Sequence, residues 1–288
     1  MSVSEELTSE REAELKNIST RIRLETVRAI GGLGIGHIGG SLSVAEMLSA
    51  LYWHQMRIDP SRPRWEERDR LVLSKGHAGP ALYAALALRG YFPLEMLNTL
   101  NRPGTSLPSH CDRNRTPGID MTTGSLGQGI SAACGMALGC RLKGLPSRVW
   151  CIIGDGECHE GQVWEAVLFA AHRKLDNLTV YVDYNKQCLD GRIDEVCGLG
   201  DLKAKFAAFG WKAESADGHN LHEIVEATAS TKRAPDGPSV VVLNTTKGFG
   251  VSFWSGKLNN HNISVSKHDM DLALYELESA LKPQYTGP

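Results

Sequence analysis

The 288-residue sequence predicts an α/β fold, with a doubly wound, mostly parallel sheet that carries helices on both faces. Short runs of consecutive apolar residues, such as residues 149–153, alternate along the chain with longer segments whose apolar residues recur at helical spacing. Strands buried on both faces have this unbroken apolar character, and their alternation with helices is typical of a parallel sheet. No fixed-period repeat or proline-rich linker divides the chain, so we predict one domain over residues 1–288, with a polar extension over about residues 1–12.

The first half of the chain is predicted to begin with a long helix, because Leu15, Ile18 and Ile22 recur at helical spacing. A glycine-rich segment ends this helix, and Ser41 or Ser43 is expected to cap the next one. In chain order, the expected elements are helices over residues 10–30 and 44–55, a strand over residues 71–73 and a helix over residues 81–89.

The second half of the chain contains three more apolar runs that we predict to be strands, each followed by a helix. On the helix after the first of them, we expect Leu168 and Phe169 to widen the buried face around Val163 and Val167. The glycine-bounded segment 206–220 is expected to be a connection. The elements are helices over residues 130–143, 161–174, 221–230 and 269–281 and strands over residues 149–153, 178–183 and 239–246.

Composition excludes several classes of function. The net charge is -2 and the isoelectric point about 6.6, so no excess of basic residues indicates a nucleic acid partner. The N-terminus lacks the apolar core of a signal peptide, and the longest uncharged run, residues 121–140, is too polar and too rich in glycine to span a membrane. The seven cysteines form no C-x-x-C pair, which is typical of reduced thiols, and we expect a cytoplasmic protein.

Two phosphate-binding motifs can be set aside. Residues 34–39 read G-I-G-H-I-G, but a dinucleotide fingerprint has to follow a strand and open a helix, whereas the preceding segment is predicted to be helical. The chain contains no G-x-x-x-x-G-K-[S/T] motif, which excludes a P-loop nucleotide site at the level of sequence.

A carboxylate follows the strand over residues 149–153, at a place where glycines would suit a phosphate. Gly154 and Gly156 flank Asp155, and two glutamates follow. A divalent cation between the carboxylate and a diphosphate would make this arrangement favourable, because Mg²⁺ prefers oxygen ligands, including phosphate oxygens. Asn185 follows the next predicted strand, 30 residues after Asp155, about the length of one βαβ unit. We therefore predict a metal site made by Asp155, Asn185 and the carbonyl of Gln187; the alternative is that Asp155 only caps a helix.

At this point the chain resembles a known family. The pattern Gly-Asp-Gly followed by a distant Asn is that of thiamine diphosphate enzymes, and several further blocks are similar, in order, to the N-terminal half of transketolase. The blocks are GHIGGSLS, DRLVLSKGHAGPALYAAL, TTGSLGQGISAACGMALG, GDGECHEGQVWEA, KLDNL and DYNKQCLDG. The resemblance implies the thiamine diphosphate-binding fold, specifically its diphosphate-binding domain, with thiamine diphosphate and Mg²⁺ as cofactors.

The resemblance also implies roles for individual residues. The catalytic histidines would be His37, His77, His110 and His261. The cofactor would be bound by His77, Gly124, Ser125, Leu126, Gly154, Asp155, Gly156, Glu160, Asn185 and His261, with Glu160 also at a dimer contact, and the metal by Asp155, Asn185 and Gln187. The remaining histidines are expected to be on the surface or structural, and these are His54, His159, His172, His219, His222 and His268.

The chain departs from the transketolase pattern in three ways. The usual Gly-His-Pro is Ser-His-Cys around His110, and Gly-Pro-Leu is Gly-Ser-Leu around Ser125. Arg113 and Arg115 follow His110 and either contact a sugar phosphate or lie in solvent. The chain ends at Pro288, whereas transketolases continue into a domain that binds the pyrimidine ring and carries the glutamate that activates the cofactor.

The predicted function is therefore that of one subunit of a split transketolase, which transfers a two-carbon ketol unit from a ketose phosphate to an aldose phosphate. It would require a separate beta subunit with the pyrimidine-binding domain, in an α2β2 heterotetramer. The alternatives are an alpha-type subunit of another thiamine-dependent enzyme and a non-catalytic regulatory paralogue. A ketoacid dehydrogenase subunit would lack the SKGHAGP and TTGSLGQG blocks.

Overall fold

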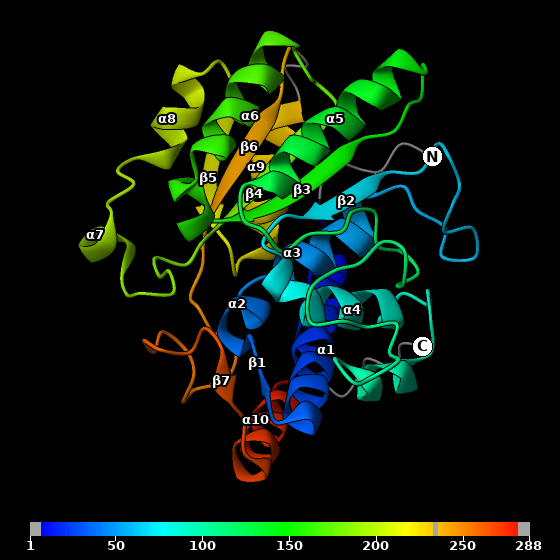
Figure 1. Ribbon diagram of the computed structural model, residues 1–288, viewed down its shortest axis with the longest axis vertical. Helices are drawn as coiled ribbons and strands as arrows, with labels where there is room; N and C mark the ends of the chain where they lie inside the picture. Colours follow the sequence, from blue (N-terminus) through cyan, green and yellow to red (C-terminus); the bar gives the residue numbers. More distant parts are fainter. Residues whose placement is uncertain (1–6, 233–235, 282–288) are drawn as a thin grey trace.

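The computed structural model describes residues 7–232 and 236–281 and has a five-stranded parallel sheet at its centre (Figure 1). The strand order is β2-β3-β4-β6-β5, and every neighbouring pair is parallel. The strands are β2 (Arg70–Leu73), β3 (Val149–Gly154), β4 (Leu178–Tyr184), β6 (Ser239–Asn244) and β5 (Lys212–Asp217). The predicted parallel α/β fold is thus confirmed.

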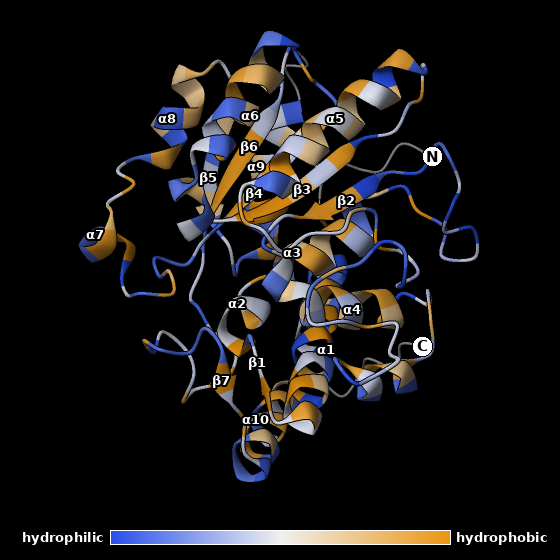
Figure 2. Cartoon of the chain, in the orientation of Figure 1, coloured by the Kyte–Doolittle hydropathy of each residue, from blue (hydrophilic) through white to orange (hydrophobic). Residues whose placement is uncertain are grey.

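Alternate residues of the strands divide the core into two layers. On one face, Cys151, Val180 and their neighbours pack against α5 (Gln128–Leu142), α6 (Gly161–His172) and α8 (Leu202–Ala208). On the other face, Trp150, Tyr181 and their neighbours belong to the core formed with α1, α3, α4, α9 and α10. These helices are α1 (Ser9–Leu33), α3 (Ala45–Ala50), α4 (Gly79–Leu88), α9 (Leu221–Lys232) and α10 (Lys267–Ala280). Both faces of the sheet are therefore covered, and Figure 2 shows the apolar character of the strands between the helices.

Short elements complete the chain. β1 (Ile35–Gly36) and β7 (Ile263–Ser264) form a separate antiparallel pair, so the G-I-G-H-I-G motif contains a two-residue strand that is not part of the parallel sheet. A π-helical turn, Leu51–Gln55, continues α3, where a single α-helix over residues 44–55 was expected. The other short elements are α2 (Ile38–Leu42), α7 (Ile193–Val196) and 3-10 turns at Gly76–Ala78, Leu94–Thr99 and Gly156–His159.

The prediction of an irregular connection over residues 206–220 is wrong in part, because this segment contains β5 and the end of α8. β5 lies at an edge of the sheet and reads Lys-Ala-Glu-Ser-Ala-Asp, in which only Ala216 is buried. A polar edge strand lacks the unbroken apolar run by which the inner strands were identified, so its sequence resembles that of a loop.

Two local predictions are also wrong. Leu168 and Phe169 do not widen the buried face of α6, because they are 60% and 40% exposed. Neither Ser41 nor Ser43 caps α3, whose N-cap residue is Val44 without a side-chain bond. At the N-terminus, α1 begins at Ser9 after the Thr8 cap, so the end of the predicted extension is helical.

The fold brings four turns together at the carboxyl ends of the parallel strands. Because β2, β3, β4 and β6 are parallel neighbours, the turns that follow them lie side by side at their carboxyl ends. These are the turns that contain the Ser74–His77 segment, Asp155, Asn185 and Lys247. Within the described residues, no helix has the length and apolar character needed to cross a membrane.

Candidate functional site

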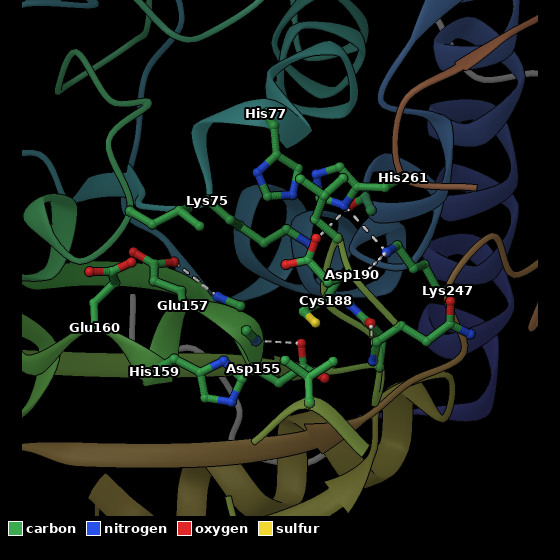
Figure 3. Close-up of a pocket in the computed structure, with 18 residues that line it drawn as sticks. Lys75, His77, Asp155, Glu157, His159, Glu160, Cys188, Asp190, Lys247 and His261 are labelled. Carbon is green, nitrogen blue, oxygen red and sulfur yellow. Dashed lines mark hydrogen bonds between the residues drawn. The ribbon is translucent and has the colours of Figure 1, made fainter. Parts of the chain in front are cut away.

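A cavity of about 300 Å³ opens at the carboxyl ends of the parallel strands (Figure 3). Its walls come from the turns after all four of these strands and from the loop that contains His261. Among the predicted site residues, the cavity is lined by His77, Leu126, Gly154, Asp155, Gly156, Glu160, Asn185, Gln187 and His261. The fold thus brings most of the predicted cofactor and metal residues to one place.

The strand ends at the predicted metal site meet as expected. Gly154 of β3 is in register with Asp183 of β4, and the N–H of Asp155 donates to the carbonyl of Asp183 at 3.2 Å. The Asp155 carboxylate accepts from the N–H of Lys186, which lies between the two other predicted metal ligands. Lys186 has a φ of +67°, an uncommon backbone conformation for a residue other than glycine. At this kink the Lys186 N–H reaches the Asp155 carboxylate that follows β3.

Asp155 has the surroundings of a carboxylate that needs a cation. It is 2% exposed, it accepts from the N–H groups of Gly156 and Lys186, and no basic side chain among the described residues forms an ion pair with it. Burial, together with the nearby Asp183 carboxylate, raises the pKa of Asp155 to about 7. A bound divalent ion would favour the charged form. The described residues hold no cluster of three or more His, Cys, Asp or Glu side chains arranged for a metal, so a site here depends on amide and carbonyl oxygens as well.

Asp183 supports this site from behind, and the sequence reasoning missed it. Its buried carboxylate forms an ion pair with Lys75, and Asn185 Nδ2 donates to it at 3.1 Å. Ser43, which was expected to be a helix cap, instead donates to Asp183 at 2.8 Å, and Thr245 donates to its other oxygen. Burial would raise the pKa of Asp183, but the Lys75 ammonium and these hydrogen bonds lower it. The network fixes the Asn185 amide, whose Oδ1 accepts one main-chain N–H at 3.1 Å and keeps a second lone pair for a ligand.

Glu157, one of the two glutamates that follow the Gly-Asp-Gly turn, has a structural position. Its carboxylate is 2% exposed and accepts from Ser74 Oγ, from the N–H of Gly127 at 2.9 Å and from the N–H of Gly154 at 3.0 Å. These three donors belong to the turn after β2, the residue before α5 and the end of β3. One carboxylate thus holds three walls of the cavity together.

The four predicted catalytic histidines form one group, which we call the histidine cluster: His37, His77, His110 and His261. The His77 and His261 ring centres are 4.8 Å apart, and the His37 ring lies 5.3 to 5.5 Å from the other three. Burial lowers the pKa of all four, that of His37 to about 4 and that of His261 to about 3, with Lys247 adding to the effect on both. The rings are therefore neutral near pH 7, when each can donate one hydrogen bond and accept another.

His37 also lines a second cavity, of about 220 Å³, together with Ser109, Asn101 and Asn262. The Ser109 hydroxyl lies 3.0 Å from His110 Nδ1. The histidine cluster therefore lies between two cavities: His77 and His261 face the first, and His37 faces the second.

Lys247 is the most important site residue that the sequence reasoning missed. It is 3% exposed, and its ammonium contacts the Cys188 carbonyl and His261 Nδ1, each at 3.3 Å. It has no carboxylate partner among the described residues, and burial and the Lys75 charge lower its pKa to about 8. An uncompensated buried cation is costly, so an anion is expected beside it. A lysine three residues after an apolar strand at the same sheet edge was the signal available in the sequence.

The remaining predicted residues are placed as follows. Gly124 lies beside His110, while Ser125 is exposed and does not line the cavity. Glu160 is at the exposed rim, directly before α6. Arg113 and Arg115 line a different cavity with Asp120, whose carboxylate accepts from the N–H of Leu71 near the start of β2, at the opposite end of the strand. These arginines therefore lie outside the cofactor cavity.

Comparison with known proteins identifies the family. Residues 14–283 match the family model described as the transketolase thiamine diphosphate-binding domain. This chain belongs to that family. It is 57% identical over 270 residues to a 6-deoxy-6-sulfo-D-fructose transketolase subunit from Clostridium sp. strain MSTE9, and it covers 98% of that protein. It is 36% identical over 268 residues to an apulose-4-phosphate transketolase subunit from Actinobacillus succinogenes and covers 96% of it.

Solved structures agree with the sequence comparison. A transketolase from Pichia stipitis in complex with sedoheptulose-7-phosphate superposes with a TM-score of 0.86 at 33% identity over 93% of this chain. The chain spans 41% of that longer transketolase but nearly the whole length of the two subunits. The predicted fold, the transketolase relationship and thiamine diphosphate as cofactor are therefore confirmed.

Proposed function

We propose that this chain is the thiamine diphosphate- and magnesium-binding subunit of a cytoplasmic two-subunit transketolase. The proposal rests on one observation: a single cavity contains a buried carboxylate and a buried ammonium, Asp155 and Lys247, for which the described residues provide no ion-pair partner. A metal–diphosphate group satisfies both at once. The five buried cysteines and the absence of disulfides among the described residues fit a reducing compartment.

The residues of the cavity suit that group. Asp155, the Asn185 side-chain oxygen and the Gln187 carbonyl would hold Mg²⁺, which leaves positions for diphosphate oxygens and water. Gly156 and Lys247 would bind the diphosphate, with His77 and His261 close by. Leu126 lines another wall of the cavity, and it would bracket the aminopyrimidine together with Gly124 and Ser125.

The histidine cluster would handle protons on the sugar. When bound, thiamine diphosphate supplies the carbon nucleophile and the electron sink for cleaving and forming the carbon–carbon bond. Neutral His37 and His110 can accept a proton from the sugar hydroxyl beside that bond and return it to the aldehyde oxygen of the acceptor. His77 and His261 can orient the hydroxyls nearest the cofactor.

The partner would be a beta subunit with the pyrimidine-binding domain, in an α2β2 heterotetramer. Support comes from the relatives, which are named as subunits and have nearly the same length as this chain. In this arrangement residues 1–288 form a single diphosphate-binding domain, and Glu160 at the rim of the cavity would contact the beta subunit. No nucleic acid or membrane partner is proposed.

The donor would be a ketose with an anionic end, and the name of the 57% identical relative makes 6-deoxy-6-sulfo-D-fructose the first to test. Loss of carbons 1 and 2 from this ketose leaves a four-carbon aldose that keeps the sulfonate at carbon 4. The acceptor aldose gains the two carbons and becomes a ketose. Ketose phosphates such as fructose 6-phosphate are the competing donors.

Reconstitution tests the proposal. The purified chain is assayed with Mg²⁺, thiamine diphosphate, a ketose donor and an aldose phosphate acceptor, with and without the beta subunit, and the four-carbon product is identified by mass spectrometry. We expect turnover by the complex only. Full activity of the isolated chain would refute the split enzyme. A complex that binds cofactor but transfers no ketol unit from either donor class would favour the non-catalytic paralogue.

A further inference from the structure

A buried cluster outside the cofactor cavity is not used by the proposed chemistry. His219, which was expected to be a surface or structural residue, has a side chain that is only 10% exposed and lies 3.1 Å from Glu46 through Nδ1. Glu46 in turn forms a two-pronged ion pair with Arg23, and both of these side chains are at most 5% exposed. Burial would raise the pKa of Glu46, but Arg23 lowers it to about 2, so its carboxylate is charged.

The other ring nitrogen of His219 holds the loop that contains Lys247. Nε2 accepts from the N–H of Thr246 at 2.8 Å. A main-chain N–H can only donate, so the ring proton has to be on Nδ1, where it faces the Glu46 carboxylate. The ion pair therefore fixes the tautomer of His219, and the tautomer presents an acceptor to the residue beside Lys247.

Ring stacking fixes the same loop a few residues further on. The His219 ring lies 3.6 Å from the Phe249 ring at an interplanar angle of 12°. The Arg23 guanidinium lies 4.9 Å from the centre of that Phe249 ring. The buried cluster thus holds Thr246 before Lys247 and Phe249 after it.

We propose that His219 is a positioning residue for Lys247: it couples the loop Thr246–Phe249 to the buried Arg23–Glu46 pair, so that the Lys247 ammonium is held at the diphosphate end of the cavity. The proposal rests on the proposed function, in which this cavity binds thiamine diphosphate. Lys247 is long and flexible, and a free lysine would lose conformational entropy on binding the anion. Holding the loop in place beforehand removes part of this cost.

A double-mutant cycle tests the coupling. In the reconstituted complex, His219→Ala, Lys247→Ala and the double variant are compared by calorimetric titration with thiamine diphosphate in the presence of Mg²⁺. We expect His219→Ala to weaken cofactor binding by about tenfold in the wild-type background and by less than about twofold in the Lys247→Ala background. Equal effects in both backgrounds, or no effect in either, would overturn the proposal.

Further variants at His219 and His222 separate positioning from general stability. His222→Ala is the matched control, because His222 is an exposed histidine on α9 that lies 3.8 Å from Glu226. His219→Gln offers an oxygen for the Thr246 N–H, so it should recover part of the affinity that His219→Ala loses. If His219→Ala does not fold, His219→Phe, which keeps a ring but offers no acceptor to the Thr246 N–H, is compared with His222→Phe: cofactor affinities within twofold of each other would refute the proposal.

The outcome also separates this inference from the proposed function. If the wild-type complex binds no thiamine diphosphate, the proposed function fails. If the wild-type complex binds it and the His219 variants bind equally well, only the positioning role fails. At saturating cofactor, kcat of His219→Ala should stay within about threefold of the wild type, because His219 lines neither cavity.

Discussion

The metal end and the histidine end of the active site are assembled in different ways. Asp155 and Asn185 follow two neighbouring parallel strands that are joined by a single helix, so the topology alone brings them together. The histidine cluster comes from four loops that are distant in sequence, and its rings meet only because the whole domain is folded. The first arrangement can be worked out from spacing and topology, whereas the second requires either a family pattern or a structure.

The two ends also differ in charge. The metal end contains two buried charged groups, Asp155 and Lys247, for which the described residues provide no ion-pair partner, and the histidine end contains neutral rings whose pKa values burial has lowered. We therefore expect changes at the metal end to alter cofactor binding and changes at the histidine end to alter turnover.

The largest effect is expected for Asp155→Ala, which should abolish magnesium-dependent binding of thiamine diphosphate in the complex. The variant removes the single carboxylate of the proposed metal site, and neither Asn185 nor a carbonyl can supply the missing charge. Titration calorimetry with and without Mg²⁺ measures this. Unchanged affinity would contradict the assignment of the metal end.

The same position gives a stability test in the absence of divalent ions. Because burial raises the folded-state pKa of Asp155 to about 7, the folded chain binds more protons than the unfolded chain between about pH 4 and pH 7, and Asp155 lowers stability as pH rises through that window. Asp155→Asn should therefore raise the melting temperature at pH 8 and have little effect near pH 4. A melting temperature that falls equally at both pH values would rule this explanation out.

At the histidine end, His37→Ala should reduce kcat by about 10² to 10⁴, the usual range for the loss of a proton-transferring group, while cofactor affinity stays within threefold. His37 lines the second cavity rather than the cofactor cavity, so its removal leaves the diphosphate site intact. His172→Ala, at the exposed end of α6, is the control for loss of a histidine. A large loss of cofactor affinity in His37→Ala would show that the two ends are not separate.

The pH dependence of cofactor affinity should also distinguish the metal end from the histidine end. Lys247 has a pKa lowered to about 8, and a bound diphosphate would favour its charged form, so cofactor affinity should fall by up to about tenfold per pH unit above pH 8. Calorimetry in two buffers of different ionisation enthalpy should detect proton uptake on binding at pH 8.5. In Lys247→Met this uptake should disappear. Proton uptake that persists in the variant would assign it to another group.

The sheet could be predicted from the sequence wherever burial leaves an unbroken apolar run, which holds for β2, β3, β4 and β6. β5 could not, because an edge strand with one buried alanine has the composition of a loop. The π-helical turn after α3 has no sequence pattern distinct from that of an α-helix, so it was missed as well.

Within the site, Asp155 and Asn185 were predictable from their spacing after two neighbouring strands. Residues that act through contacts between distant parts of the chain were not predictable. Glu157 was visible as a carboxylate beside a glycine turn, but its three donors come from separate parts of the chain. Asp183, near the end of β4, forms an ion pair with Lys75 in the turn after β2, across the intervening strand β3, and only the folded structure pairs them. Charged residues just after apolar strands, including Lys247, are the signal of this site in the sequence.

The smallest effect is expected for Gln187→Ala, which tests whether Gln187 contributes its main-chain carbonyl or its side chain to the metal site. Gln187 is assigned a role through its main-chain carbonyl, while its side chain donates to the Gly256 carbonyl at 3.2 Å. Removing the side chain should therefore change metal affinity by less than about threefold, whereas Asn185→Ala, which removes a proposed ligand oxygen, should weaken it by tenfold or more. Competition with Mg²⁺ by Mn²⁺, followed by electron paramagnetic resonance, measures both variants. If Gln187→Ala proves as damaging as Asn185→Ala, the third protein ligand is the side chain, and the kink at Lys186 serves to aim that side chain rather than the carbonyl.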